Sequence, residues 1–272
     1  MSRARLDSVI IMGIVNVTPD SFSGDGVACD LKSMDQVVQK HIDDGAHILD
    51  IGGQSTRPGA QEVAAQVELA RVVPAIKHIK TYWPKIKLSV DTFRPEVMRA
   101  ALDMGVDLIN DVKSFSEPGT LDVIKDAPCE IMMMHMQGQP MTMQNNPYYT
   151  DVVKEVSDFL SIKMEIIHQQ CHIPLEKMWI DPGFGFGKKP VDNFKLLGNL
   201  NDLLAINTNL CVGMSRKSMI GYALGDMALP RQTGTACANM IAWQQGARMF
   251  RVHDVRETVD AIRVAQQVMS DL

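Results

Sequence analysis

Polar residues that could carry chemistry recur at the ends of short apolar segments along this chain. They are amides, carboxylates, histidines, a hydroxyl and cations, namely Asn16, Asp50, Asp91, Asn110, His135, Asp181, Ser215, Arg216, Lys217, Arg251 and His253. One polar residue in such a position is commonplace and serves a local hydrogen bond or a helix cap. Because nearly every apolar segment ends this way, we expect these side chains to converge on one site.

Arg251 and His253 lie two residues apart at the end of the last apolar segment. In an extended strand, residues two apart point to the same side, so both can face one ligand. An arginine fork suits a pair of phosphate oxygens, and a helix start at 215–218 would add N–H groups that favour an anion. We therefore predict an anion pocket here. The alternatives are a salt bridge at the rim for Arg251 and a Schiff base on Lys217.

Asp91 and Asp181 each follow an apolar strand, which would remove both carboxylates from water at a cost unless a donor satisfies them. A heterocycle with ring N–H and amino groups would do so, while Asn110 offers a donor and an acceptor and Lys217 donates to a carbonyl oxygen. The alternatives are a helix cap or a pair with Lys217. Two further carboxylates are interpreted as structural: Asp50 and Asp111.

The loops at 16–22 and 56–59 are rich in turn formers and carry hydroxyl, amide and cationic groups. Such loops can close over a site. The methionines of 132–136 are interpreted as core and pocket lining, with Met134 as a wall of the ligand site.

The elements that must position these residues alternate between short apolar strands and longer segments of helical period. The first helical segment has Leu31, Met34, Val37, Val38 and Ile42 on one face, and the last has Val255, Val259, Ile262, Ala265 and Val268. The predicted strands are 9–15, 48–51, 87–90, 108–110, 130–134, 178–180, 210–213 and 249–252. Eight apolar strands with intervening helices predict an α/β fold, a single (β/α)8 TIM barrel, with a doubly wound open sheet as the alternative.

Glycine, proline and polar residues collect after the predicted strands, at 16–26, 52–60 and 181–190, whereas the loops before strands are plainer. In βα barrels the chemistry lies after the strands, and the loops following the last two strands are a frequent phosphate site. This asymmetry marks one rim of the barrel as the working face.

The whole-chain composition favours an enzyme of small molecules. The 272 residues are 46% hydrophobic and carry a net charge of −5 without a basic run, so we expect one domain over 1–272 and no nucleic-acid partner. No segment approaches the length of a membrane helix, and the start has no signal core, so we expect a cytoplasmic protein. The cysteines lack a CxxC pair and are expected to be reduced, mostly buried thiols: Cys29, Cys129, Cys171, Cys211 and Cys237.

Taken together, the strand-end motifs resemble those of the dihydropteroate synthase family. The resemblance extends from about residue 10 to 265 and rests on their order: MGIVNVTPDSFSGDG, LDIGGQSTRPGA, SVDTFRPEV, INDV, MMMHMQG, IDPGFGFGK, VGMSRKSMIG and FRVHDV. It implies a TIM barrel and a reaction in which p-aminobenzoate displaces pyrophosphate from 6-hydroxymethyl-7,8-dihydropterin pyrophosphate, giving 7,8-dihydropteroate for folate synthesis. It also implies Mg²⁺ as cofactor, sulfonamides as inhibitors and a homodimer.

The resemblance also implies roles for individual residues. Asn16, Asp91, Lys217 and Arg251 would be catalytic, with Asn16 as the magnesium contact. The pterin would contact Asp91, Asn110, Val112, Met134, Asp181, Phe186 and Lys217. The pyrophosphate would contact Asn16, Thr56, Arg251 and His253. The p-aminobenzoate slot would consist of Phe22, Arg57, Pro58, Lys217 and Ser218.

Two positions depart from the family pattern. The first loop reads SFSGDG where the family often has SFSDGG, so its acid stands one position later, at Asp25. The second loop has Gln54 where Glu is more frequent, which removes a charge whose role we interpret as structural. We expect activity to survive both changes.

Three other functions remain open at this point. A pterin barrel that transfers a methyl group from methyltetrahydrofolate to a corrinoid protein would need no pyrophosphate pocket. A non-catalytic pterin-binding protein need not retain Asn16, Thr56 and Arg57 together. A Schiff-base aldolase using Lys217 would be trapped by borohydride with a carbonyl substrate.

Overall fold

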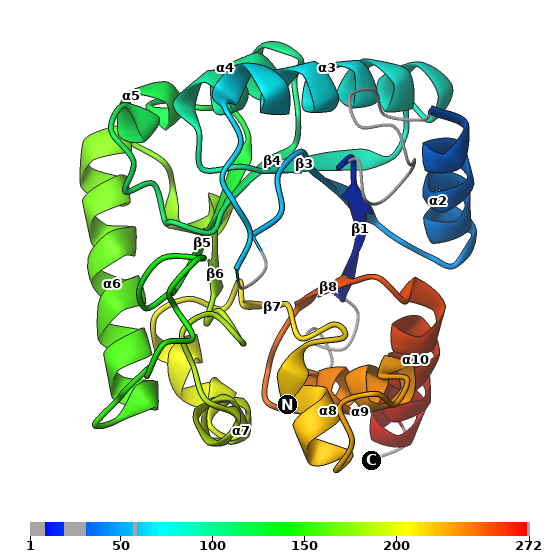
Figure 1. Ribbon diagram of the computed structural model, residues 1–272, viewed down its shortest axis with the longest axis vertical. Helices are drawn as coiled ribbons and strands as arrows, with labels where there is room; N and C mark the ends of the chain where they lie inside the picture. Colours follow the sequence, from blue (N-terminus) through cyan, green and yellow to red (C-terminus); the bar gives the residue numbers. More distant parts are fainter. Residues whose placement is uncertain (1–8, 19–30, 57–58, 271–272) are drawn as a thin grey trace.

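The strands form one parallel eight-stranded sheet that curves into a barrel. The computed structural model describes residues 9–18, 31–56 and 59–270. Neighbouring strands in the chain pair in parallel, and β1 pairs with β8, which gives the order β6-β5-β4-β3-β2-β1-β8-β7. A single bridge between Ile180 and Leu210 links the two ends of this order. The TIM barrel expected from the sequence is therefore confirmed (Figure 1).

The strands in the described ranges are β1 (Ile10–Asn16), β2 (Ile48–Gly52), β3 (Lys87–Asp91), β4 (Leu108–Asp111), β5 (Glu130–Met134), β6 (Met178–Asp181), β7 (Cys211–Val212) and β8 (Met249–Val252). The α-helices in the same ranges are α2 (Leu31–Asp43), α3 (Ala65–Tyr82), α4 (Pro95–Asp103), α5 (Thr120–Ile124), α6 (Val152–Cys171), α7 (Pro190–Gly198), α8 (Ser218–Ala223), α9 (Gln232–Gln244) and α10 (Val255–Ser270). The predicted strands at 130–134 and 249–252 match exactly, and β7 is shorter at both ends than predicted.

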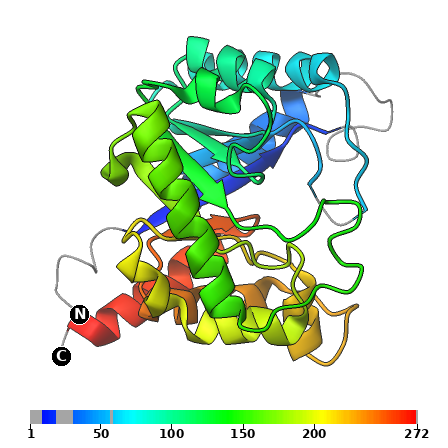
Figure 2. The same ribbon diagram turned by 90° about the vertical axis from the view of Figure 1, so that its left-hand side faces the viewer.

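The helices ring the strands, as Figures 1 and 2 show. Their buried apolar side chains join those of the strands in one large core. On α2, Met34 and Val38 are fully buried, as the periodicity predicts. On α10, Val255 and Ile262 are buried, whereas Val268 is 61% exposed, so the predicted apolar face ends before the last turn of that helix. None of the helices in the described segments is both long and apolar enough to span a bilayer.

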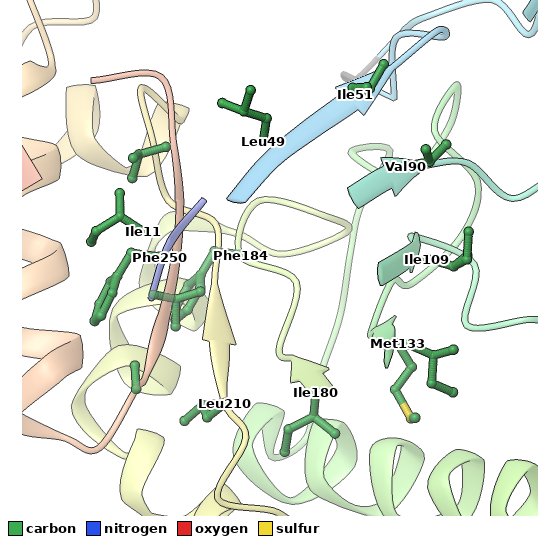
Figure 3. Close-up of a cluster of buried hydrophobic side chains, with 14 of the residues drawn as sticks. Ile11, Leu49, Ile51, Val90, Ile109, Met133, Ile180, Phe184, Leu210 and Phe250 are labelled. Atoms are coloured by element: carbon green, nitrogen blue, oxygen red, sulfur yellow. The ribbon is translucent and has the colours of Figure 1, made fainter. Parts of the chain in front are cut away.

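Alternate residues of each strand face the helices or the barrel interior. The outward set forms the large core and includes Ile11, Leu49, Ile51, Val90, Ile109, Met133, Ile180, Leu210 and Phe250, drawn on successive strands in Figure 3. The inward set forms a separate cluster that fills the barrel: Met12, Ile48, Leu108, Met132, Trp179, Cys211 and Met249. Because side chains alternate with period two, the next inward positions lie nearer the carboxyl ends of the strands. On β2, β4, β6 and β8 these positions hold Asp50, Asn110, Asp181 and Arg251.

Of the cysteines in the described ranges, Cys129, Cys171 and Cys211 are buried free thiols and Cys237 is exposed, while Cys29 lies outside those ranges. Cys211 belongs to the apolar barrel filling. The prediction of reduced, mostly buried thiols is thus confirmed for three of them.

Candidate active site

The strand register places the polar strand ends side by side in the barrel mouth. Asn16 pairs with Gly52, Gly52 with Asp91, and Asp91 with Asn110, which forms one row across β1 to β4. On the other side of the barrel, Met134 of β5 pairs with Asp181 of β6. Residues from distant parts of the chain therefore meet at one end, as the sequence predicts.

Arg251 reaches across the interior and binds two carboxylates. Its Nε donates to Asp50 Oδ2 at 2.6 Å and its Nη2 to Asp91 Oδ2 at 2.7 Å. Asn110 Nδ2 donates to the same Asp50 oxygen at 3.3 Å. Asp50 is 0% and Asp91 6% exposed, so these are desolvated ion pairs. Their other oxygens, Oδ1 of each, are buried without a hydrogen-bond partner and remain able to accept.

Burial dominates the electrostatics of these groups. It raises the pKa of Asp91 to about 7, against the opposing effect of Arg251 and with the help of the Asp50 charge. Burial alone would lower the pKa of Arg251, but Asp50 and Asp91 outweigh it and raise that pKa. The guanidinium is thus a permanent cation, while Asp91 is poised between its charged and neutral forms.

Two glycines keep the interior open beside these side chains. A Cβ on Gly213 would lie 3.6 Å from Asp181 Oδ2 and 3.9 Å from Arg251 Cβ. A Cβ on Gly52 would lie 3.5 Å from Asn16 Oδ1 and 3.9 Å from Asp91 Cβ. Larger residues at either position would enter the space where the polar groups meet, so the glycines leave room for a ligand.

Asp181 faces this space from β6 and is held by the loop that follows. Its Oδ1 accepts a hydrogen bond of 2.7 Å from the N–H of Gly183, and burial raises its pKa while Lys217 opposes the shift. Lys217 Nζ donates to the Phe184 carbonyl and lies 4.4 Å above the ring centre of Phe186. Burial lowers the pKa of Lys217 to about 8, which keeps the ammonium form available at neutral pH.

An apolar wall stands next to these polar groups. Phe93, Val112 and Met134 form a buried cluster of their own, with Met136 and Phe186 packed against it. Flat rings are held by such walls, with a few polar groups fixing their orientation. The structure therefore brings the three predicted wall residues together and adds Phe93 and Met136.

His253 lies at the end of β8, where Ser215 fixes its ring. The Ser215 hydroxyl accepts from the backbone N–H of His253 at 3.1 Å and lies 3.0 Å from Nδ1 of the ring. The hydroxyl can donate to Nδ1 or accept from it, depending on the tautomer of the ring. Next to it, Arg216 adopts φ of 57° and pairs bidentately with Asp254, which ties the loop after β7 to the loop after β8.

The barrel thus has an apolar wall, paired buried carboxylates and a cationic end. The chain that forms it matches known proteins over nearly its whole length. The model of the family described as pterin binding enzyme matches residues 12–253. The chain is 45% identical over 260 residues to dihydropteroate synthase of Escherichia coli, covering 96% of this chain and 92% of that protein. It is 44% identical over 259 residues to the same enzyme of Haemophilus influenzae, covering 94% and 92%.

The chain belongs to the dihydropteroate synthase family.

Solved structures of the family superpose on the whole barrel. A Yersinia pestis dihydropteroate synthase with a sulfonamide drug complex gives a TM-score of 0.89 at 42% identity, covering 97% of this chain and 96% of that one. A Xanthomonas albilineans dihydropteroate synthase in complex with 7,8-dihydropteroate gives 0.84 at 38% identity, covering 97% and 94%. The same enzyme with 4-aminobenzoic acid gives 0.89 at 43%, again covering 97% and 94%.

The synthase roles assigned by resemblance divide into three groups in the structure. Those that meet inside the barrel mouth are Asn16, Asp91, Asn110, Val112, Met134, Asp181, Phe186, Lys217 and Arg251, with His253 at the end of β8. Thr56 is half-buried in the loop after β2, and Ser218 is exposed at the start of the short helix α8. Phe22, Arg57 and Pro58 lie outside the described residues, so the expected p-aminobenzoate slot stays a prediction.

Asp50 is interpreted from the sequence as a structural residue. The structure places Asp50 in direct contact with Arg251 and Asn110, inside the site. The period-two rule could have found it, because Asp50 and Gly52 of β2 share the inward face. For Asp111 the structural interpretation fits: its carboxylate accepts from the N–H groups of Lys113 and Phe115 at 2.7 Å each.

The departure at Gln54 has a visible structural role. Gln54 is buried, and its Oε1 accepts a hydrogen bond of 3.1 Å from the N–H of Val63, which closes the base of the second loop. A neutral amide makes this bond as a carboxylate would, without the cost of burying a charge. The other departure, at Asp25, lies outside the described residues.

Proposed function

We propose that this chain condenses 6-hydroxymethyl-7,8-dihydropterin pyrophosphate with p-aminobenzoate to 7,8-dihydropteroate and pyrophosphate. The observation that carries the proposal is the site around Arg251, where Asp50, Asp91 and Asn110 meet beside a buried aromatic wall. Its support from relatives is the dihydropteroate synthase family, whose solved members include complexes with the product and with 4-aminobenzoic acid.

The pterin would bind with its polar edge toward the carboxylates. The unpartnered oxygen of Asp91 and the carboxylate of Asp181 suit ring N–H and amino donors, and Asn110 adds an amide. Lys217 would donate to the ring carbonyl oxygen, and Val112, Met134 and Phe186 would cover the ring faces. The buried Oδ1 of Asp91 thereby gains a partner that the described part of the protein does not supply.

The pyrophosphate would leave toward the cationic end of the site. We assign its contacts to Asn16, Thr56, Arg251 and His253, with the Nε2 proton of His253 donated to a phosphate oxygen. The C–O bond to the methylene breaks with its electron pair going to pyrophosphate, and the electron-rich ring shares the positive charge left behind. The amine of p-aminobenzoate then forms the C–N bond and releases a proton to solvent. Fixed donors at the departing oxygens lower this barrier without a strong general base.

Magnesium fits this site as an ion that arrives with the pyrophosphate. Among the described residues there is no cluster of three metal-binding side chains, and Mg²⁺ bound through phosphates requires only one or two protein oxygens. Asn16 Oδ1, at the open space over Gly52, would supply one. When bound, the ion would neutralise charge on the leaving pyrophosphate.

The test is turnover by the purified chain. With the pterin pyrophosphate, p-aminobenzoate and Mg²⁺, we expect equimolar 7,8-dihydropteroate and pyrophosphate by chromatography and a coupled pyrophosphate assay. The corrinoid methyltransferase alternative predicts methyl transfer from methyltetrahydrofolate and no pyrophosphate. Absence of dihydropteroate from a folded, pterin-binding protein would refute the proposed reaction.

The titration of Asp91 predicts a pH effect. A proton on Asp91 removes an acceptor for the pterin, so kcat/KM for the pterin pyrophosphate should fall tenfold per pH unit below a pKa of about 7. Because the Asp50 charge helps to raise that pKa, Asp50→Asn should move this limb to lower pH. Asp126→Asn, which removes an exposed carboxylate beside His172, is the control and should leave the profile unchanged. An acid limb unmoved by Asp50→Asn would exclude Asp91 as the titrating group.

We also propose that the chain forms a homodimer in the cytoplasm. Large apolar side chains are exposed on α8 and the segment after it: Tyr222, Leu224, Met227 and Leu229. Apolar side chains grouped on a surface favour burial against another protein surface, and a second copy supplies the same apolar chemistry. Light scattering should give twice the 30.1 kDa of the chain, and a monomer at micromolar concentration would refute this part.

A further inference from the structure

Lys188 is a buried lysine that the proposed reaction does not use. It is 2% exposed, and its Nζ lies 2.9 Å from the Gly183 carbonyl oxygen, 3.2 Å from that of Phe186 and 2.9 Å from Nδ1 of His135. The His135 carbonyl oxygen is a fourth acceptor at 3.3 Å. An ammonium has three protons, so every one of them has an acceptor inside the protein.

The surroundings of Lys188 define its charge. Burial lowers its pKa to about 7, and the Asp181 and Asp192 carboxylates oppose that shift while Lys217 adds to it. Burial also lowers the pKa of His135 to about 3, so its ring is neutral and Nδ1 can accept the ammonium proton. The charge of Lys188 in turn lowers the pKa of Asp181, together with Lys217 and Arg251.

The loop that Lys188 holds is tightly constrained by backbone geometry. Gly183 and Gly187 have φ of 70° and 62°. A Cβ on Gly183 would lie 1.8 Å from the His135 carbonyl oxygen, and a Cβ on Gly187 would lie 2.3 Å from the Gln137 carbonyl oxygen. The loop thus lies directly against the segment after β5. Further bonds run from Gly185 N–H to Asn193 Oδ1 at 2.7 Å and from the Tyr149 hydroxyl to the Gly187 carbonyl at 2.8 Å.

This loop carries three parts of the proposed pterin site. Gly183 N–H binds Asp181, the Phe184 carbonyl binds Lys217, and Phe186 belongs to the apolar wall. Lys188 donates to the carbonyl oxygens of the first and last of these loop residues, Gly183 and Phe186, so its ammonium constrains the distance between them.

We propose that Lys188 is a positioning residue of the reaction, which joins the carbonyls of Gly183 and Phe186 to the His135 ring and thereby sets Asp181 and the Phe186 ring against the pterin. The inference rests on the proposed function and deepens it at the pterin end of the site. It makes Lys188 a residue that acts through the loop, without touching the substrate.

The test is Lys188→Met, which keeps the buried chain length and removes the ammonium. The KM for the pterin pyrophosphate and the Kd of 7,8-dihydropteroate should rise on the order of 10- to 100-fold, as for groups that orient contacting residues, with a much smaller change in the KM for p-aminobenzoate. A folded variant with the wild-type pterin KM, or with equal rises for both substrates, would overturn the proposal.

A matched control and a milder variant complete the design. Lys177→Met removes a lysine that donates to the Pro128 carbonyl at 2.8 Å before β6, at the opposite end of the barrel, and should leave both KM values unchanged. If Lys188→Met does not fold, Tyr149→Phe removes only the hydroxyl that holds Gly187. It should raise the pterin KM selectively by a few-fold, and an unchanged pterin KM in that variant would equally refute the role of the loop. Wild-type turnover, measured in the same assay, tests the reaction separately.

Discussion

Arg251→Ala should lower kcat/KM for the pterin pyrophosphate about 1,000-fold, which is the largest loss we expect from any one substitution. The guanidinium is the permanent cation between Asp50 and Asp91, and we assign it to the departing pyrophosphate. The KM for p-aminobenzoate should change far less, because that substrate carries no phosphate. Calorimetry with each substrate measures the two losses of affinity separately. Equal losses for the pterin pyrophosphate and for p-aminobenzoate would contradict the position of the anion pocket.

The same substitution should also destabilise the fold, and this effect has to be separated from catalysis. Without Arg251, two buried carboxylates lose their cation, at a cost of about 3–5 kcal/mol in the free energy of unfolding. The double variant Arg251→Ala with Asp50→Asn removes one of those charges and should recover much of the stability. It should not recover turnover. If stability and turnover return together, the role of Arg251 is in folding alone.

Asp181→Asn should weaken binding of the pterin on the order of 100- to 1,000-fold. The N–H of Gly183 donates to Asp181 Oδ1, and the amide oxygen of an asparagine would keep that bond. Its NH₂ group would then face the pocket, where a donor meets the ring donors of the pterin instead of an acceptor. A buried donor without a partner is costly, so the loss should exceed that of a single hydrogen bond.

The control for this variant is Asp158→Asn, which makes the same chemical change on the exposed side of α6, where the carboxylate accepts from Lys154 Nζ at 2.6 Å. It should keep wild-type affinity for 7,8-dihydropteroate by fluorescence titration. Unchanged affinity in Asp181→Asn, with the protein folded by circular dichroism, would remove Asp181 from the site.

The barrel could be predicted because its signals are local. Alternation of apolar strands with helical segments, and polar residues at strand ends, are readable one segment at a time, and the strand register then brings those ends together. Val268 shows where this prediction fails: it continues the helical period of α10, yet among the described residues its side chain is 61% exposed. Periodicity gives the face of a helix but not the length over which that face is covered.

The contacts inside the site were less predictable, because they depend on which of several acceptors a long cation reaches. Arg251 lies 201 residues from Asp50 in the chain, and only the closed barrel brings the two within 2.6 Å. In the sequence, Lys188 is one of two adjacent lysines after a glycine-rich loop, and lysines are usually exposed. The structure makes Lys188 buried and Lys189 exposed, a difference that no local pattern encodes.

The central claim is that the barrel mouth has a pterin end at Asp91 and Asp181 and a phosphate end at Arg251 and His253. A crystal structure with the pterin pyrophosphate and p-aminobenzoate tests it directly. We predict the ring between the carboxylates and Phe186, with the phosphates on Arg251 and the Nε2 of His253. A ring that leaves Asp181 without a contact, or phosphates bound away from both Arg251 and His253, would contradict it.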